Sequence, residues 1–104
     1  MPKLLVLYPQ PIDVAAFDRH YDEVHIPLSK RLPGLKRYAV SRNQMVVRGD
    51  DPYYLVAELD WDDMDSMQAD FQSPLGQEVG QDVAENLEKL CPGMQSMIIQ
   101  LEDV

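Results

Sequence analysis

The sequence predicts a ferredoxin-like α+β sandwich in which two helices pack on one face of a four-stranded antiparallel sheet. Apolar runs of strand length alternate with amphipathic helical patterns in the order β-α-β-β-α-β, within 104 residues. A Pro-Gly pair closes each helical pattern, at Pro33-Gly34 and at Pro92-Gly93. We therefore expect a single domain over residues 1–104 with one hydrophobic core.

The first half of the chain predicts one strand and one amphipathic helix. Lys3–Tyr8 is a mainly apolar run, typical of a buried central strand, and Asp13 is a favourable N-cap for the following helix. Pro27 cannot donate to the helical ladder, so we expect the ladder to be broken between Glu23 and Pro27, near His25. Ile26 falls on the side opposite the core. The core-facing stripe recurs at steps of three and four residues and comprises Phe17, Tyr21, Val24, Leu28 and Leu32.

The second half predicts three more strands and a second helical region. Asp62 and Asp63 precede that region, where acids favour the positive end of the helix dipole. Ser73-Pro74 restarts the helix as cap and first residue. The inner face of the region comprises Met64, Met67, Phe71, Val79, Val83, Leu87 and Leu90. The predicted strands are Leu35–Val47, in which an interruption around Asn43 stays open, Tyr53–Trp61 and Met94–Leu101, with a turn at Gly49–Pro52.

Apolar residues occur at both parities of the first and last predicted strands. The first strand is apolar at every position of Leu4–Leu7, and Met97 and Ile98 in the last strand have opposite parity. Because alternate residues point to opposite faces of a sheet, the face without helices is also apolar and needs a cover. No further helix is predicted, so we expect a second copy of the chain to supply the cover in a homodimer.

Composition and charge exclude several classes of function. The net charge is -9, and this field repels nucleic-acid backbones and anionic membrane surfaces. No apolar run reaches the length of a membrane-spanning helix and no signal-peptide pattern opens the sequence, so we expect a cytoplasmic protein. Cys91 is the single cysteine, which excludes a disulfide framework and a thiolate metal cluster.

Two short motifs resemble the EthD family. The first comprises His20-Tyr21, His25-Ile26-Pro27-Leu28 and Leu32-Pro33-Gly34-Leu35, closing on Tyr38. The second is Ser73-Pro74-Leu75-Gly76-Gln77 with Asp82 following, and Leu5-Val6-Leu7-Tyr8 is similar to the family's first strand. The family often has Asn-Phe shortly after that aspartate, where this chain has Asn86-Leu87. The resemblance covers nearly the whole chain.

The resemblance implies a homodimer whose two sheets form a shared dimeric α/β barrel, with a cleft between the sheet and helices of each subunit. EthD-like proteins are linked to bacterial breakdown of fuel ethers beside an oxygenase system, and relatives in the wider superfamily include cofactor-independent monooxygenases, isomerases and polyketide cyclases. The implied activity is cofactor-independent proton-transfer, isomerase, cyclase or monooxygenase-type chemistry on a small apolar or aromatic carbonyl compound. The implied setting is a degradative or secondary-metabolic pathway. The alternative is a non-catalytic carrier that supports an oxygenase system.

The candidate catalytic residues are His25 as general acid and base and Tyr38 as an orienting hydrogen-bond donor. An imidazole with a pKa of about 6.5 both takes and gives a proton near neutrality, and a phenol can hold a carbonyl oxygen while charge builds on it. Plainer interpretations stay open. His25 can tie the interrupted helical turn to a backbone carbonyl, and Tyr38 can be an ordinary cross-strand aromatic residue.

Tyr21, His20 and Phe17 are the candidate substrate-binding residues: Phe17 and Tyr21 lie on the core-facing stripe of the helix, and His20 lies just off the edge opposite to His25. Tyr21 can equally belong to the core and His20 to the solvent edge. On a regular helical wheel His20 and His25 are roughly 140° apart, so we do not expect them to bind one metal ion together.

No phosphate loop, dinucleotide fingerprint, zinc spacing or nucleophile elbow occurs in the sequence. The acids around Asp60–Asp65 lack the glycine and the closing glutamate of a calcium loop. We therefore expect no cofactor, and a haem would need one of the two histidines as its axial ligand. Three hypotheses remain open: a cofactor-independent enzyme, a carrier, and a structural dimer whose cleft is filled by its own side chains. A cavity with one polar end would support the first two and exclude the third.

Overall fold

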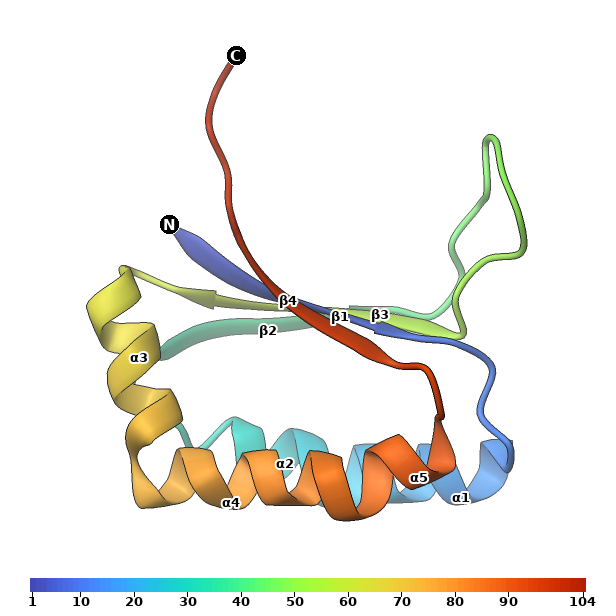
Figure 1. The fold of residues 1–104 in the computed structure, drawn as a ribbon, viewed down its shortest axis with the longest axis horizontal. Helices are drawn as coiled ribbons and strands as arrows, with labels where there is room; N and C mark the ends of the chain where they lie inside the picture. The colour runs from blue at the N-terminus through green and yellow to red at the C-terminus, as the bar shows by residue number, and fades with distance from the viewer.

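The computed structural model describes residues 1–104 and confirms the predicted order of strands and helices. Strands β1 (Pro2–Tyr8), β2 (Leu35–Ser41), β3 (Leu55–Trp61) and β4 (Gln95–Gln100) form one antiparallel sheet in the order β2-β3-β1-β4. All the helices lie on one side of this sheet (Figure 1). The loop between β2 and β3 and the C-terminal residues extend on the other side. This is the ferredoxin-like arrangement that the sequence predicts.

Strands β2 and β3 are shorter than the sequence predicts by two residues or more, and β4 is shorter by one residue at each end. β2 ends at Ser41 instead of Val47, and β3 begins at Leu55 instead of Tyr53. Residues 42–54 form the projecting loop, in which Met45 and Val47 are 90% and 95% exposed. The local β-propensity of this run does not produce a strand, because the chain has left the sheet and meets no partner strand there.

The first helical layer contains α1 (Val14–His20), the π-helical turn η1 (Tyr21–His25) and α2 (Ile26–Ser29). Asp13 caps α1 as predicted, because its carboxylate accepts from the Ala16 amide at 3.0 Å. In η1 the Ile26 amide donates to the Tyr21 carbonyl, five residues earlier. The predicted irregularity near His25 is therefore a widened turn that precedes Pro27, and not a break in the helix.

The π turn changes which residues face the core. It inserts an extra residue into one turn and so rotates the rest of the helix relative to a regular wheel. Val24 is 44% exposed, whereas His25 and Ser29 are only 5% and 1% exposed. The prediction that Val24 lies in the core is therefore wrong, and Leu28 is only half-buried. Ile26, expected on the opposite side, packs against the core.

The second helical layer contains α3 (Met64–Gln72), α4 (Pro74–Asp82), a second π turn η2 (Val83–Leu87) and α5 (Glu88–Leu90). The predicted caps are confirmed. Asp63 accepts from the Ser66 amide at 2.7 Å, and Ser73 accepts from the Gly76 amide at 3.0 Å. No proline or other signal in the sequence indicates η2. None of these helices combines the length and the apolar character needed to span a bilayer.

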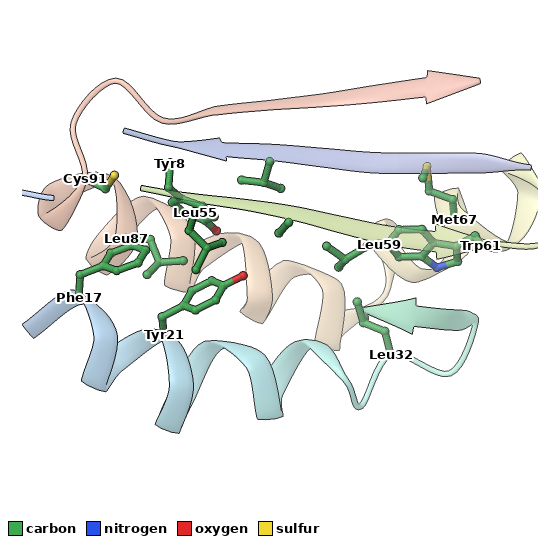
Figure 2. Packing of buried hydrophobic residues seen from close by; sticks show 12 residues of the cluster. Tyr8, Phe17, Tyr21, Leu32, Leu55, Leu59, Trp61, Met67, Leu87 and Cys91 are labelled. Carbon is green, nitrogen blue, oxygen red and sulfur yellow. The ribbon is translucent and has the colours of Figure 1, made fainter. Parts of the chain in front are cut away.

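The core between sheet and helices is built from large aromatic and aliphatic side chains (Figure 2). At one end Phe17 and Tyr21 rise from the first helical layer toward Tyr8 on the sheet. The ring of Tyr8 meets those of Phe17 and Tyr21 edge to face, with centroids 5.3 and 5.4 Å apart. Trp61 and Met67 fill the other end.

Candidate active site

A cavity of about 440 Å³ lies between the sheet and the helices, within the volume range of typical small-molecule sites. Its wall is mainly apolar and includes no aspartate, glutamate, lysine or arginine side chain. Its polar groups include His25 and Ser29 from the first helical layer and Tyr38 from β2. Such a wall favours a neutral, mainly apolar molecule with few polar atoms, because an ion would lose its hydration without gaining an opposite charge.

His25 is held in place by the second helical layer. Its Nδ1 lies 2.8 Å from Oδ2 of Asp82, the last residue of α4, and its ring stacks on that of Tyr21 with centroids 5.6 Å apart. Because an ionised carboxylate can only accept, Nδ1 carries the hydrogen and donates it to Asp82. The other ring nitrogen, Nε2, has no hydrogen-bond partner in the protein, and His25 lines the cavity. His25 therefore offers a lone pair at the polar end of the cavity.

Asp82 receives three hydrogen bonds. Nε2 of His20 and Nδ2 of Asn86 lie 2.6 and 2.9 Å from its Oδ1, beside the bond that its Oδ2 accepts from His25. Burial alone would raise the pKa of Asp82, but the bonds from His25, His20 and Asn86 outweigh burial and lower that pKa. Asp82 is therefore ionised at neutral pH and fixes the orientation of both imidazoles.

The environment of His25 keeps its imidazole neutral. Burial lowers its pKa below the ordinary value of 6.5, and the neighbouring His20 lowers it further. The hydrogen bond and charge of Asp82 act in the opposite direction but do not reverse the shift. A neutral imidazole with its proton on Nδ1 can accept a proton at Nε2. The site therefore presents a base, and Asp82 would stabilise the cation that forms when the base is used.

The two histidines converge, which a regular helical wheel does not predict. His20 directly precedes η1 and His25 is its last residue, and they donate to the two oxygens of one carboxylate. The roughly 140° separation assumed 100° per residue, and the π turn removes that assumption. His20 does not line the cavity; its side chain is 22% exposed at the outer edge of the network. No group of three or more His, Cys, Asp or Glu side chains has a geometry that could hold a metal ion.

Tyr38 reaches the same cavity from β2 and is paired with Tyr21. The two hydroxyl oxygens are 2.7 Å apart, so one phenol donates to the other. Burial raises the pKa of both phenols, which are therefore neutral at pH 7. When Tyr21 is the donor, the proton of Tyr38 is free to donate to a ligand, and the first bond strengthens the second.

The remaining sequence candidates lie behind this wall. Phe17 is fully buried and its ring stacks on that of Tyr21 with centroids 5.4 Å apart. Neither residue lines the cavity, so the expected direct contact of Phe17 and Tyr21 with a substrate has no basis in this geometry. Tyr21 contacts His25 and Tyr38 instead, and Phe17 packs behind Tyr21. The Cys91 thiol is also remote: it donates to the Pro9 carbonyl, and burial raises its pKa to about 11, which makes it a poor nucleophile.

Sequence reasoning missed two residues of the site. Asp82 enters the sequence prediction only as part of a family motif. It lies on the same helix face as Val79 and Val83, and a charged residue on an apolar stripe is itself a signal of a site. Ser29 lies four residues after His25, at helical spacing, and lines the cavity with it. Neither signal was decisive before the π turn fixed which helix face is buried.

Solved structures share this fold along almost the whole chain. An EthD family protein of Bacillus halodurans superposes with a TM-score of 0.84 at 35% identity, over 98% of this chain and 99% of that one. A dimeric ferredoxin-like protein of unknown function from Jannaschia has a TM-score of 0.69 at 20% identity, over 96% and 98% of the two chains. SnoaB, a cofactor-independent oxygenase of Streptomyces nogalater, has a TM-score of 0.67 at 16% identity, over 99% and 94%. At such low identity, the last two establish the fold alone.

Sequence comparison places the chain in a family. An uncharacterised 11.0 kDa protein from the thcB–thcC intergenic region of Rhodococcus erythropolis is 33% identical over 84 residues, which cover 81% of this chain and 82% of that protein. Residues 9–88, which include both histidines, Tyr38 and Asp82, match the EthD domain. The chain therefore belongs to the EthD domain family.

Proposed function

We propose that the protein binds a small, mainly apolar carbonyl compound in the cavity and moves a proton on it with His25, without a cofactor. The observation that carries this proposal is the buried Asp82–His25 pair, with 2.8 Å between Oδ2 and Nδ1 and the opposite ring nitrogen unpaired at the cavity. A base oriented by a carboxylate next to an apolar cavity is the arrangement that general base catalysis requires. The cavity of about 440 Å³ also argues against a cleft filled by its own side chains.

The proposed step is removal of a proton from the carbon next to the carbonyl group. The C–H electron pair moves toward the carbonyl oxygen and forms an enolate, while Nε2 of His25 takes the proton. The Asp82 carboxylate stabilises the resulting imidazolium through Nδ1, and the Tyr38 hydroxyl donates to the enolate oxygen. Return of the proton to another atom would complete an isomerisation. The fold likeness to a cofactor-independent oxygenase fits chemistry of this kind, which needs no cofactor.

Exchange of deuterium into 1-tetralone, a neutral bicyclic ketone, tests this proposal. In D₂O at pH 7 the wild-type protein is expected to accelerate loss of the ketone's α-proton signals in the NMR spectrum. His25→Gln should reduce this acceleration by about 10²-fold or more while the fold is retained, because glutamine cannot act as the base. Exchange that is equally fast in His25→Gln would overturn the assigned role. Tight binding of the ketone without any exchange would instead support the carrier alternative.

We also propose that the protein is a homodimer. The sheet face away from the helices carries, beside the charged residues Lys3, Glu58 and Asp60, an apolar cluster of five side chains that the strand registers bring together: Leu5, Leu7, Val56, Met97 and Ile99. The loop at residues 42–54 and the C-terminal residues extend on this same side of the sheet (Figure 1). A second copy of the sheet would cover this face, and the dimeric ferredoxin-like relative from Jannaschia supports that choice.

Sedimentation tests the dimer directly. The wild-type protein should sediment at about twice its chain mass of 11.9 kDa at micromolar concentration. Leu7→Glu should give a folded monomer, because it places a charge on the apolar face without entering the core beneath the helices. A wild-type protein that is monomeric and soluble at high micromolar concentration would contradict the proposal.

A further inference from the structure

Ser29 has a feature that its place in the helix does not require. It is 1% exposed, and its Oγ is buried without any hydrogen-bond partner. A serine within a helix commonly donates back to the carbonyl four residues earlier, but Ser29 makes no such bond. A buried polar group without a partner destabilises the fold, and alanine would occupy the same space without that penalty. The free protein therefore gains nothing from this hydroxyl.

The position of Ser29 connects the hydroxyl with the cavity. Ser29 is a wall residue of the cavity and follows His25 by four residues, so the two side chains are neighbours on one helix face, with Cβ atoms roughly 5–6 Å apart. The wall has further hydroxyls on Tyr8, Tyr38 and Ser96, and that of Tyr38 is bonded to Tyr21. Among the wall residues, Ser29 alone has a buried side-chain oxygen or nitrogen without a hydrogen-bond partner, and it lies on the helix face that carries His25.

We propose that Ser29 is a substrate-binding residue whose hydroxyl donates to an oxygen of the bound molecule. This inference rests on the proposed function of the cavity and narrows its ligand class. The ligand is a neutral, mainly apolar compound with an acceptor oxygen, such as a ketone, positioned so that the carbon next to the carbonyl group lies near Nε2 of His25. An ion is disfavoured because no charged side chain of Asp, Glu, Lys or Arg lines the wall. A pure hydrocarbon would leave the Ser29 hydroxyl unpaired.

A matched pair of probes tests this assignment. 1-Tetralone carries a carbonyl oxygen, and tetralin has the same two rings without it. Binding of both is measured by calorimetry and by the fluorescence of Trp61, the single tryptophan, which lines the cavity. The variants are Ser29→Ala and, as a control, Ser96→Ala, which removes the exposed hydroxyl of the other serine in the wall.

Ser29→Ala should weaken binding of 1-tetralone about 3- to 10-fold and leave binding of tetralin unchanged, because one hydrogen bond to the oxygen is lost. Its melting temperature without ligand should be equal to that of the wild type or higher. Ser96→Ala should behave as the wild type in both respects. This combination would not arise if Ser29 were merely a packing residue.

Four outcomes would overturn the assignment. A melting temperature of Ser29→Ala that falls by about 4 °C or more would mean that the hydroxyl already has a partner in the free protein. Equal weakening of both probes would indicate lost packing, and unchanged binding of 1-tetralone would exclude the hydrogen bond. If Ser96→Ala weakens binding of 1-tetralone but not of tetralin, the donor to the ketone oxygen is Ser96 and not Ser29. If one of the three binding outcomes occurs and deuterium exchange still depends on His25, only the role of Ser29 is refuted. If the wild type binds neither probe, the proposed function is refuted together with the role of Ser29.

Discussion

Asp82→Asn probes the central contact of the site with a nearly isosteric change. The carboxylate accepts from His20 and Asn86 at Oδ1 and from His25 at Oδ2. An asparagine has only one acceptor oxygen, and its amide nitrogen donates. If its oxygen takes the place of Oδ1, two bonds survive, but its NH₂ group then faces the N–H at Nδ1 of His25. The imidazole must move its proton to Nε2 to relieve this conflict.

The expected loss of stability follows from these bonds. One charge-assisted bond, worth about 1.5–3 kcal/mol, disappears or becomes neutral, and the two surviving bonds lose their charge assistance. We expect a loss of about 2–4 kcal/mol in the free energy of unfolding. Glu78→Gln is the matched control, because Glu78 is an exposed acid on the same helix without a recorded bond, and its loss should change stability by less than about 0.5 kcal/mol.

Two measurements check this reasoning. Chemical denaturation gives the stability difference, and long-range ¹H–¹⁵N NMR spectra of the imidazoles report which ring nitrogen carries the proton. The wild type should show His25 protonated on Nδ1 and Asp82→Asn should show it on Nε2, with deuterium exchange of 1-tetralone reduced about 10²-fold or more. A wild-type His25 protonated on Nε2 at pH 7, or a variant that keeps the proton on Nδ1, would refute the reasoning.

Three further predictions concern the pH response, the phenol pair and helix packing. The pKa of His25 is lowered in the fold, so the contribution of His25 to stability is complete above the ordinary value of 6.5 and declines as the pH falls toward the lowered pKa. Chemical denaturation between pH 7.5 and 5 should show this decline, and His25→Gln should abolish it. Tyr38→Phe should weaken 1-tetralone binding about 3- to 10-fold in titrations if its hydroxyl meets the ligand, and Tyr21→Phe should have a smaller effect. Gly76→Ala would place Cβ 1.9 Å from the backbone oxygen of Asp70 and should lower the free energy of unfolding by about 3 kcal/mol or more, as measured by thermal denaturation. In Gly80→Ala the added Cβ meets no atom within 4 Å, so this control should raise the free energy of unfolding by about 0.5–1 kcal/mol.

Much of the fold can be predicted from the sequence because its signals are local. Hydrogen-bonding caps act within four residues, and Asp13, Asp63 and Ser73 cap their helices as expected. Pro-Gly pairs end helices through backbone constraints alone. The order of apolar runs then leaves few topologies that bury them, so the order of strands and helices is confirmed. The long strand predicted to Val47 failed because a strand needs a neighbour to pair with.

The composition of the site was decided only by tertiary structure. Periodicity arguments assume 100° per residue, and the π turn at Tyr21–His25 breaks that assumption, so His25 is buried and Val24 exposed. His20 and His25 converge on Asp82, more than fifty residues away along the chain, because the two helical layers pack side by side on one face of the sheet. The sequence by itself determined which chemical groups are available and which elements carry them. Their distances and protonation states depend on contacts between distant segments, which no local pattern records.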